Sequence, residues 1–380
     1  MDNQDPKKAF LHRNQRIYLR NEHQDYRHPI LKMSLLIILM AIFVVGAYGF
    51  RIYSQASNAL GNAYHPTDKT HISHTIAEGK PVTILLLGVD TGDEGRTDRG
   101  NSDTMILATV NPKTKKTVLM SIPRDTLAEI YGIKSSKRVI QKINSAYNLG
   151  EEAAAMKTVE KLLDIHIDHY VTMDFHSLPK IVDAVEGITV DSPFAFSYDG
   201  SSFKKGKQVI TGKQSLSYAR MRYEDSEGDY GRQKRQRQVI MAIVKKTLSL
   251  SALPNMQKLL NSISGSMSTD LSFNDITTLM QSYRDAAQKM ESDHLQGHGA
   301  TIDGLSYEIA PTSELQRVSN KIRRGVGLDS ITLNNEETKL NRLNEQYNNF
   351  DFDSEINQSY IIYGKNVNSD YVTEGDSEDN

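Results

Sequence analysis

Two groups of residues have types suited to joint chemistry: a pair of Asp-Thr dipeptides and a set of arginines further along the chain. The dipeptides are Asp90-Thr91 and Asp103-Thr104. The strings SYARMR and DYGRQKRQRQ contribute Arg220, Arg222, Arg232, Arg235 and Gln236. Guanidinium groups bind phosphate in a bidentate manner. Two neighbouring carboxylates bind Mg²⁺, which usually takes its other ligands from substrate phosphates. Together these residues predict a substrate that contains a pyrophosphate.

The acidic residues flank two strands that are predicted to be neighbours. Residues 82–89 (VTILLLGV) form a continuous apolar run, which is typical of a strand buried on both faces. Asp90 follows this run, and Asp103 begins the next one, DTMILATV. If the strands are antiparallel neighbours, both carboxylates meet at one end of the sheet. The other interpretation is that they only cap strands or turns. The polar, glycine-rich loop between them includes Arg99 and is typical of a functional segment.

A third strand returns the chain to the same end of the sheet. The run TVLMSI at 117–122 is joined to the second strand through Asn-Pro-Lys-Thr, which predicts a hairpin. Arg124 then follows this strand, with Asp125 as its orienting partner; a surface ion pair is the alternative. Lys142 lies before a helix predicted at 151–163, and by itself it is typical of a solvated lysine.

The second group of residues belongs to a long helix predicted at 230–248. Arg232, Arg235 and Gln236 recur at helical spacing on one face, and Val239 continues that stripe. The amino end of a helix favours anions, and Asp229 would cap it or pair with an arginine. A solvated basic face is the common alternative. The two arginines of the preceding SYARMR string favour an anion site.

The remaining pattern predicts an α/β fold. Helices are expected at 178–185 and 274–290, and strands at 170–175, 188–190 and 304–309. Strands that alternate with helices indicate a sheet covered by helices on both faces. From about residue 334 to residue 380 the chain is acidic, rich in Asn and Ser and poor in aliphatic residues. This composition predicts a disordered tail.

One segment is long and apolar enough to cross a membrane. Residues 30–50 read ILKMSLLIILMAIFVVGAYGF, which at about 1.5 Å per residue spans a hydrocarbon core of about 30 Å. A cleaved signal peptide and a buried core helix are the alternatives. The polar leader 1–29 and the lack of an A-x-A site argue against cleavage. The leader is basic, so the positive-inside rule predicts a single-pass type II protein with a cytoplasmic N-terminus. Residues 51–79 would form an extracellular polar stalk.

Composition and topology exclude several classes of function. The chain has no cysteine, so it has neither disulfides nor thiolate chemistry, and its formal net charge is −2. An extracellular position removes nucleic acid as the partner of the basic helix. The 29 residues before the apolar segment are too few for a DNA-binding domain.

Four strings in order carry a family resemblance over residues 80–250: LLLGVDTG, SDTMILATVNPKTKKTVLMSIPRD, KINSAYNLG and YARMR followed by DYGRQKRQRQ. In these motifs the chain resembles the LytR-CpsA-Psr family of Gram-positive cell-wall proteins. The resemblance implies a three-layer α-β-α sandwich with a central mixed sheet, and residues 251–333 would form a helical and strand extension of that domain. It also implies an apolar tunnel for the tail of a polyprenyl-pyrophosphate lipid.

The function that the resemblance implies is transfer of a glycopolymer from the lipid carrier to peptidoglycan, with formation of a phosphodiester bond. Asp90 and Asp103 match the family's metal-linked aspartates, for Mg²⁺ or Mn²⁺. The positions that match its pyrophosphate-binding residues are Arg124, Arg220, Arg222, Arg232 and Gln236, with Arg99 and Lys142 matching less closely and Arg235 in the same basic string. The catalytic set is therefore expected to be Asp90, Asp103, Arg124 and Arg232. Glu186 stands where the family usually shows glycine.

Several alternatives stay open at the level of sequence. A pyrophosphatase would use the same residues with water as the acceptor, and a lipid-binding regulator of wall autolysis or transcription would use them without turnover. Asp90 and Asp103 are weak candidates for the general base, since a metal ligand is a poor free base. The glycopolymer could be a teichoic acid, a capsular polysaccharide or another wall polysaccharide. The oligomeric state is also open.

Overall fold

A computed structural model describes residues 27–61, 63–66, 74–89, 100–249, 265–354 and 356–364. The chain divides into two compact units, Met1–Gln55 and Ala56–Asn380. Helix α2 (Arg27–Gly61) begins in the first unit and ends in the second. The two units are therefore described separately.

The described part of the first unit is helical. Within α2, Met40, Phe43 and Val45 are among several large apolar side chains that are more than half exposed. No helix among the described residues has the length and hydropathy needed to span a membrane. The anchor expected at residues 30–50 stays a prediction.

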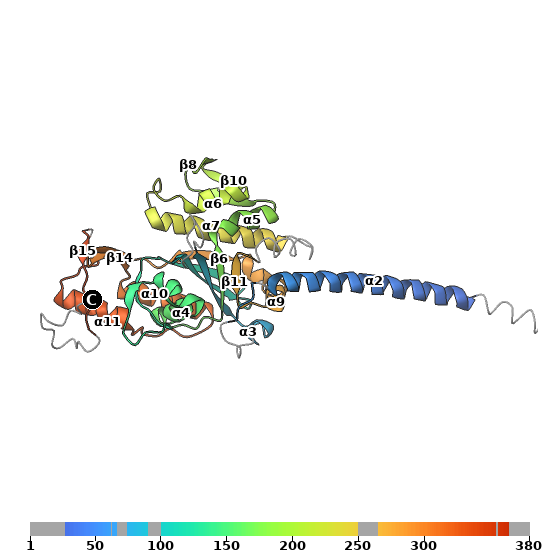
Figure 1. Ribbon diagram of the computed structural model, residues 1–380, viewed down its shortest axis with the longest axis horizontal. Helices are drawn as coiled ribbons and strands as arrows, with labels where there is room; N and C mark the ends of the chain where they lie inside the picture. Colours follow the sequence, from blue (N-terminus) through green and yellow to red (C-terminus); the bar gives the residue numbers. More distant parts are fainter. Residues whose placement is uncertain are drawn as a thin grey trace, which may run out of the picture. The chain divides into compact units, whose positions relative to one another are not determined.

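The second unit is built on a mixed sheet, which has six strands among the described residues (Figure 1). Their order is β11-β6-β1-β2-β3-β12. The bounds are β1 (Val82–Val89), β2 (Ser102–Asn111), β3 (Lys116–Ile122), β6 (His169–Asp174), β11 (Met267–Thr269) and β12 (Met290–His294). Strand β1 is parallel to β6, and β3 is parallel to β12, whereas the other neighbours are antiparallel. The predicted mixed sheet is confirmed. Both of its edge strands, β11 and β12, come from the extension expected at 251–333.

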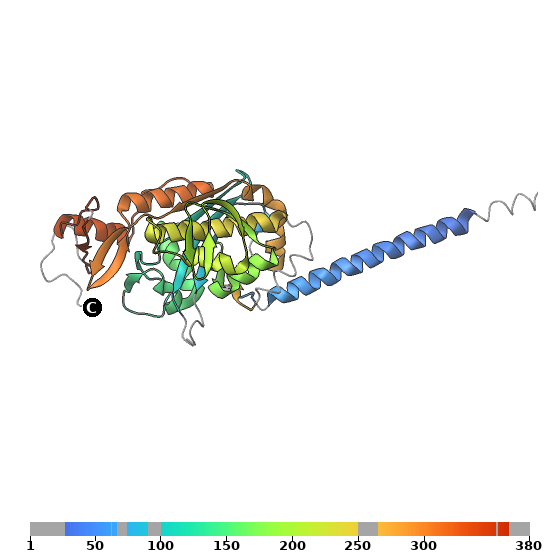
Figure 2. The same cartoon turned by 90° about the horizontal axis from the view of Figure 1, so that it is seen from above.

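Helices cover both faces of this sheet. The helices and 3-10 turns of the second unit are α3 (His74–Ala77), α4 (Ser145–Leu163), η2 (Phe175–Ser177), α5 (Leu178–Ala184), α6 (Gly212–Arg220), α7 (Gly228–Ser249), α9 (Phe273–Ser282), η3 (Arg284–Ala287), α10 (Thr312–Gly325) and α11 (Glu336–Tyr347). Because side chains alternate along a strand, Leu85 and Leu107 pack with α4 and α10, while Ile84 and Ile106 point to the face covered by α7 and α9. Seen from above, α7 lies over the sheet (Figure 2).

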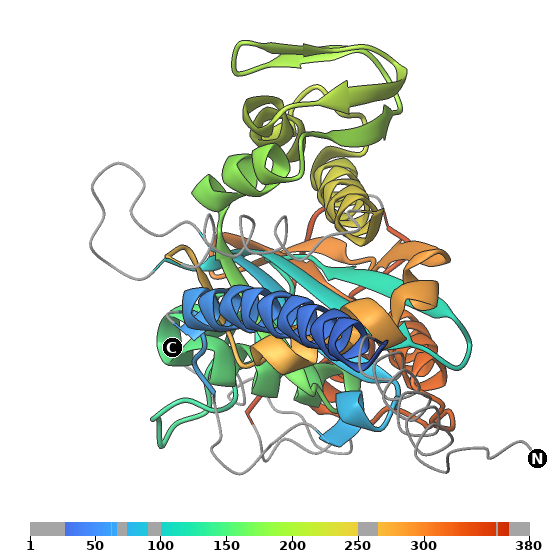
Figure 3. The same cartoon turned by 90° about the vertical axis from the view of Figure 1, so that its right-hand side faces the viewer.

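The layer that contains α5, α6 and α7 has a core of its own. Two short antiparallel pairs complete it: β7 (Ile188–Ser192) with β10 (Gly206–Ile210), and β8 (Phe196–Tyr198) with β9 (Ser201–Phe203). In Figure 3 these strands lie outermost, beyond the three helices. Phe196, Phe203 and Tyr218 stack at the centre, with ring centroids 4.7 to 5.7 Å apart. This layer therefore has an aromatic core of its own.

Residues that were expected to be helical up to 290 form two kinds of structure. Helix α9 ends at Ser282, and Met290 begins the edge strand β12. Tyr283 stops the helix because its ring is buried and its hydroxyl donates to the carbonyl of Lys80 at 2.6 Å. The following residues then pair in parallel with β3. Pairing with β3, and not local helix preference, determines the conformation of residues 290–294. The prediction of a single helix is therefore wrong.

The expectation of a disordered tail from residue 334 is also wrong for the described residues up to 364. Helix α11 begins at a capping box formed by Asn335 and Thr338. Leu340 and Leu343 of α11 pack against Phe350. The chain then adds β15 (Gln358–Ser359) to a small sheet with β13 (His298–Ile302) and β14 (Leu305–Ile309). Residues 365–380 lie outside the described part. The composition of this segment is mostly polar, but its few apolar residues lie at positions that pack into a core.

The polar stalk expected at 51–79 is partly built into the folded unit. Leu60 and Ala63 are buried in the core of the α5–α7 layer. Ile76 is buried in the core between the sheet and α9. The backbone of Ala63 and that of His65 bond to Thr269 of strand β11. The folded unit therefore starts before the expected boundary at residue 80.

Candidate functional site

The antiparallel pairing of the first two strands, on which the predicted meeting of Asp90 and Asp103 depends, is confirmed. Strands β1 and β2 are antiparallel, with Gly88 opposite Thr104 and Val89 opposite Ser102. Asp103 therefore lies at the end of the sheet where β1 finishes. Asp90 and Arg99 lie outside the described residues.

Arg124 is held against Asp103 by the predicted hairpin. Strand β3 pairs Ile122 with Met105, which returns the chain to the start of β2. The Nη1 atom of Arg124 donates to Oδ1 of Asp103 at 2.7 Å. Burial alone would lower the pKa of Arg124, but the charge and hydrogen bond of Asp103, with Asp125 and Asp229 nearby, raise it above its ordinary value. Arg124 is a fixed cation, oriented by a carboxylate.

Lys142 joins this group through Asp125. Strand β4 (Leu127–Glu129) pairs with β5 (Ile140–Lys142), placing Leu127 opposite Lys142. The Lys142 ammonium lies 2.8 Å from Oδ1 of Asp125, and Nε of Arg124 lies 3.6 Å from Oδ2 of the same carboxylate. All three side chains are about one-third exposed. The two cations are therefore open to a ligand.

Asp229 organises the basic residues at the start of α7. Its Oδ1 accepts from Nε of Arg232 at 2.9 Å and lies 3.8 Å from Nε of Arg222. Its Oδ2 accepts from the amide of Gln233 at 2.8 Å. Burial alone would raise the pKa of Asp229, but the charge of Arg232 and the hydrogen bonds from Gln233 and Arg232, with Arg124 nearby, hold it below its ordinary value. Arg124 and Asp229 are close enough to interact electrostatically. Arg124, Lys142, Arg222 and Arg232 therefore form one cluster of cations.

Arg235 is placed differently from the expectation. Its side chain is 2% exposed, and it forms an ion pair with the equally buried Asp225. Its guanidinium also donates to the carbonyl oxygens of Tyr218 and Met221. These partners hold the corner between α6 and α7. Arg235 therefore contributes to the fold of the site, because its guanidinium is occupied by these three partners.

An apolar cavity of about 300 Å³ lies between the sheet and the α5–α7 layer. The sheet contributes Leu86, Gly88, Thr104, Val171 and Met173 to its lining, and the helices contribute Leu178, Ile181, Ala219, Val239, Ile240, Ile243 and Val244. The separate core of the α5–α7 layer leaves this space at its junction with the sheet.

Gln236 is the polar exception in the cavity lining. It is 5% exposed, and neither amide atom has a hydrogen-bond partner among the described residues. The buried hydroxyl of Thr104, beside Asp103, also lacks a partner there. Arg220 lies over the ring of Phe175, another lining residue, with 5.9 Å between its Cζ atom and the ring centroid. Unpaired buried amides are uncommon, so this end of the cavity is suited to a polar ligand group.

Asp103 is the described residue expected to bind the metal. Oδ1 of Asp103 is bonded to Arg124, and Oδ2 has no donor among the described residues. No cluster of three or more His, Cys, Asp or Glu residues suited to a metal occurs in the described part of the chain. Oδ2 of Asp103 is thus one carboxylate oxygen left for a metal at the predicted end of the sheet. This fits Mg²⁺, which takes most of its ligands from phosphate and water.

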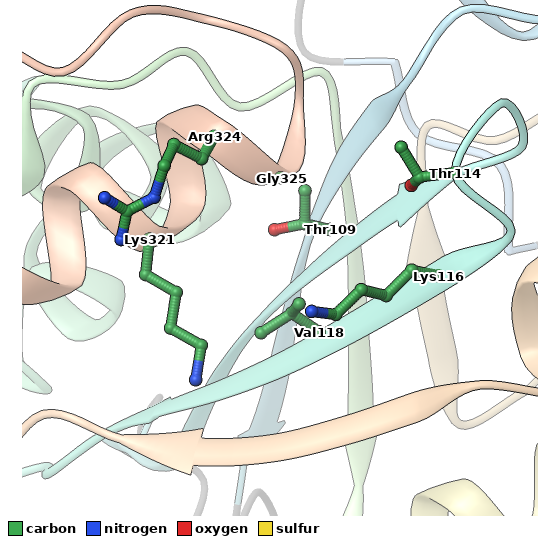
Figure 4. A pocket seen from close by; sticks show the side chains of 7 residues that line it. All are labelled: Thr109, Thr114, Lys116, Val118, Lys321, Arg324 and Gly325. Atoms are coloured by element: carbon green, nitrogen blue, oxygen red, sulfur yellow. The ribbon is translucent and has the colours of Figure 1, made fainter.

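A second cavity, of about 370 Å³, lies on the opposite face of the sheet, between β2, β3 and α10 (Figure 4). Lys116, Lys321 and Arg324 border it. Lys116 is paired with Glu291, and Lys321 is paired with Asp293. None of the predicted site residues that the structure describes lines this cavity.

Comparisons with known proteins agree on the family. The LytR_cpsA_psr family matches residues 48–324, a longer stretch than the motifs alone span. The polyisoprenyl-teichoic acid–peptidoglycan teichoic acid transferase TagU of Enterococcus faecalis is 44% identical over 288 residues, which cover 76% of this chain and 94% of that protein.

Solved structures of similar proteins share the fold. The crystal structure of protein gbs0355 from Streptococcus agalactiae has 40% identity and a TM-score of 0.63, and covers 70% of this chain and 94% of its own. A structure of TagT bound to LIIa-WTA has 26% identity and a TM-score of 0.56, with coverages of 68% and 95%. The mixed sheet, the ordered motifs and these matches show that the chain belongs to the LytR_cpsA_psr family.

Proposed function

We propose that this protein transfers a glycopolymer from a polyprenyl-pyrophosphate carrier to peptidoglycan and forms a phosphodiester bond. The observation that carries the proposal is the unpaired amide of Gln236, which lines an apolar cavity and lies one helical turn from Arg232. The TagU relatives are named as teichoic acid transferases, which favours a teichoic acid as the glycopolymer.

The two parts of the site fit the two parts of the carrier. The aliphatic lining of the cavity suits an isoprenoid chain, which would gain hydrophobic stabilisation on burial. At the polar end, Gln236 and Thr104 would bond to phosphate oxygens. Arg220, the last residue of α6, and Arg222, in the segment that follows it, would bind the pyrophosphate.

The cations provide the chemistry of phosphoryl transfer. The sugar hydroxyl of peptidoglycan forms a new bond to the glycan-side phosphorus, the bridging P–O bond breaks, and polyprenyl phosphate leaves with the electron pair. Negative charge grows on the bridging oxygen. Arg124 and Arg232 would stabilise that charge, and Asp103 and Asp229 already hold these two guanidiniums in place. Preorganised cations of this kind are the main source of catalysis in phosphoryl transfer.

Asp90 and Asp103 would hold Mg²⁺, with Mn²⁺ as the other candidate. Bound there, the ion would neutralise pyrophosphate charge and polarise a phosphoryl oxygen. Asp103 would bind with the Oδ2 atom that Arg124 leaves free.

We also propose that residues 30–50 anchor the protein in the cytoplasmic membrane, with the second unit outside the cell. The sequence of this segment and its basic leader support the assignment. A carrier with a long isoprenoid chain stays in the bilayer, so an anchor keeps the enzyme within reach of it.

Reconstitution tests the transferase. The full chain in detergent receives a polyprenyl-pyrophosphate glycan, peptidoglycan fragments and Mg²⁺, and the products are analysed by mass spectrometry. We expect a phosphodiester-linked glycan on muramic acid with the wild type and none with Asp103→Asn. Release of free glycan phosphate in place of the linked product would show that the protein is a hydrolase.

A further inference from the structure

A carboxylate from the C-terminal strands lies beside the cluster of cations. The backbone N–H of Glu308 in β14 donates to the carbonyl oxygen of Asp125 at 2.9 Å, and Thr126 forms a parallel bridge with Glu308. Asp125 directly follows Arg124. The neighbouring Tyr307 ring lies under Lys142, with 5.5 Å between the ammonium and the ring centroid. The β13–β14 pair thus forms part of the site's wall.

Glu308 is held there by a neutral partner. The hydroxyl of Tyr230 donates to Oε2 of Glu308 at 3.2 Å and accepts from the backbone N–H of Gly297 at 2.7 Å. A Cβ atom at position 297 would lie too close to Oε2 of Glu308, so the absence of a side chain at Gly297 lets the carboxylate take this position. Tyr230 follows Asp229 directly in α7. The position of the carboxylate is therefore specified from both the strand and the helix.

Glu308 differs from the other acidic groups of the cluster in its partners. Asp103 is paired with Arg124, Asp125 with Lys142 and Asp229 with Arg232. An ion pair with a cation makes a carboxylate a weaker base. Oε1 of Glu308 has no hydrogen-bond donor among the described residues, so it is available to an incoming hydroxyl.

The surroundings of Glu308 strengthen it as a base. Burial raises its pKa, and the negative charges of Asp125 and Asp229 raise it further, whereas the hydrogen bond from Tyr230 and the charge of Arg222 act in the opposite direction. His294 is a further titratable group in these surroundings, since its ring lies against that of Tyr230, with 4.9 Å between the centroids. A base is most effective when its pKa approaches the working pH.

We propose that Glu308 is the general base that takes the proton from the attacking sugar hydroxyl. The role rests on the proposed transferase function. As the hydroxyl oxygen forms its bond to phosphorus, its proton moves to Oε1 of Glu308, and the bridging P–O bond breaks to release polyprenyl phosphate. The protonated Glu308 returns its proton to solvent after release. Tyr230 acts as a positioning residue for the carboxylate.

The first test uses Glu308→Gln in the full chain, with kcat and KM for the acceptor measured in the reconstituted reaction. Glutamine keeps the size and the hydrogen bond from Tyr230 but accepts no proton. We expect kcat to fall by on the order of 10²- to 10⁴-fold, with the Kd for the lipid carrier and the Tm unchanged. A fall of less than threefold would overturn the proposal, and so would a matching loss of lipid binding, which indicates a structural role.

The pH dependence provides a second readout. Activity of the wild type should decline on the acidic side as Glu308 becomes protonated, and Glu308→Gln should lose this limb. Tyr230→Phe removes a hydrogen bond that lowers the pKa of Glu308, so its acidic limb should move to higher pH. An unchanged limb in both variants would contradict the assignment.

The same experiment separates this role from the proposed function. If the wild type releases only free glycan phosphate, the transferase function fails, but Glu308→Gln still tests the base, because an attacking water must also lose a proton. A wild type that forms the phosphodiester while Glu308→Gln matches it would reject Glu308 alone. A wild type with no turnover on any donor would reject both.

Discussion

At the scale of single residues, the carboxylate partner of each arginine decides whether that arginine can take part in the site. Arg232 and Arg235 lie three positions apart in α7, and both belong to the same basic string. Arg232 is oriented by Asp229, whereas Arg235 is buried in an ion pair with Asp225. Helical spacing cannot separate these two roles, because the partner that buries Arg235 comes from the preceding loop.

Arg232→Ala should weaken binding of the lipid carrier. The pyrophosphate loses a charge-assisted partner, which corresponds to about 1.5–3 kcal/mol, or roughly a 10- to 150-fold higher Kd. Lys234→Ala is the matched control: it removes the same charge from the same helix, but Lys234 is exposed and paired with Glu227. Fluorescence titration with a labelled polyprenyl pyrophosphate measures both variants. Equal Kd values for the two would remove Arg232 from the site.

At the scale of elements, the strands around the site were predictable from local pattern, whereas the pairing of the later segments was not. Strands β1 to β3 are apolar runs separated by polar segments, so their positions and the β2–β3 hairpin followed from the pattern. The antiparallel pairing of β1 with β2 was only a condition there, and the structure meets it. Strand β12 carries the sequence MESDH, which has no strand pattern and depends on pairing with β3. Strand β14, which carries Glu308, was expected at 304–309, but its bridge to Thr126 beside the site was not. The spacing of Glu308 from the arginines therefore carried no signal.

The α6–α7 corner gives a prediction about Gly231. A Cβ atom there would collide with the Asp225 carboxylate, which holds the buried Arg235. Gly231→Ala should therefore destabilise the protein by about 2–4 kcal/mol, because it disturbs a buried ion pair. Gly299→Ala, where a Cβ atom meets open space, should change stability by less than about 0.5 kcal/mol. Urea denaturation followed by circular dichroism compares the two, and similar midpoints would contradict the packing argument.

Helix α11 gives a prediction about pH. Burial raises the pKa of Glu337 to about 7, with the charges of Glu129 and Glu336 adding to the effect. An acid with a raised folded-state pKa stabilises the fold below its ordinary pKa, and this stability is lost as the pH rises through about 7. The wild type should therefore be less stable at pH 8 than at pH 5, by up to about 3 kcal/mol.

Glu337→Gln should remove most of that pH dependence, whereas Glu345→Gln on the exposed face of the same helix should keep it. Urea midpoints at pH 5 and pH 8 measure the effect for the three proteins. A wild-type curve that is flat over this range would show that Glu337 is charged and solvated in solution.

At the scale of the second unit, function depends on a junction between two separately packed layers. The sheet packs with α4 and α10 on one face, and the α5–α7 layer has its own aromatic core on the other. The cavity lies where the second layer meets the sheet. Cores of folded proteins are close-packed, so an apolar space of this size indicates a binding role.

If the cavity holds the isoprenoid chain, filling it should weaken binding of the chain and leave binding of the pyrophosphate unchanged. Ile240 lines the cavity from α7, and Ile240→Phe should occupy space needed by a long isoprenoid chain. The Kd for a long-chain polyprenyl pyrophosphate should rise at least about tenfold, since each buried CH₂ contributes about 0.8 kcal/mol. A short-chain isoprenyl pyrophosphate should bind as it does to the wild type, because the arginines and Gln236 are untouched. Ile240→Leu conserves volume and should bind both ligands normally. If Ile240→Phe weakened both ligands equally, the cavity and the cluster of cations would be coupled through the fold of α7, and the division of the carrier between them would be incorrect.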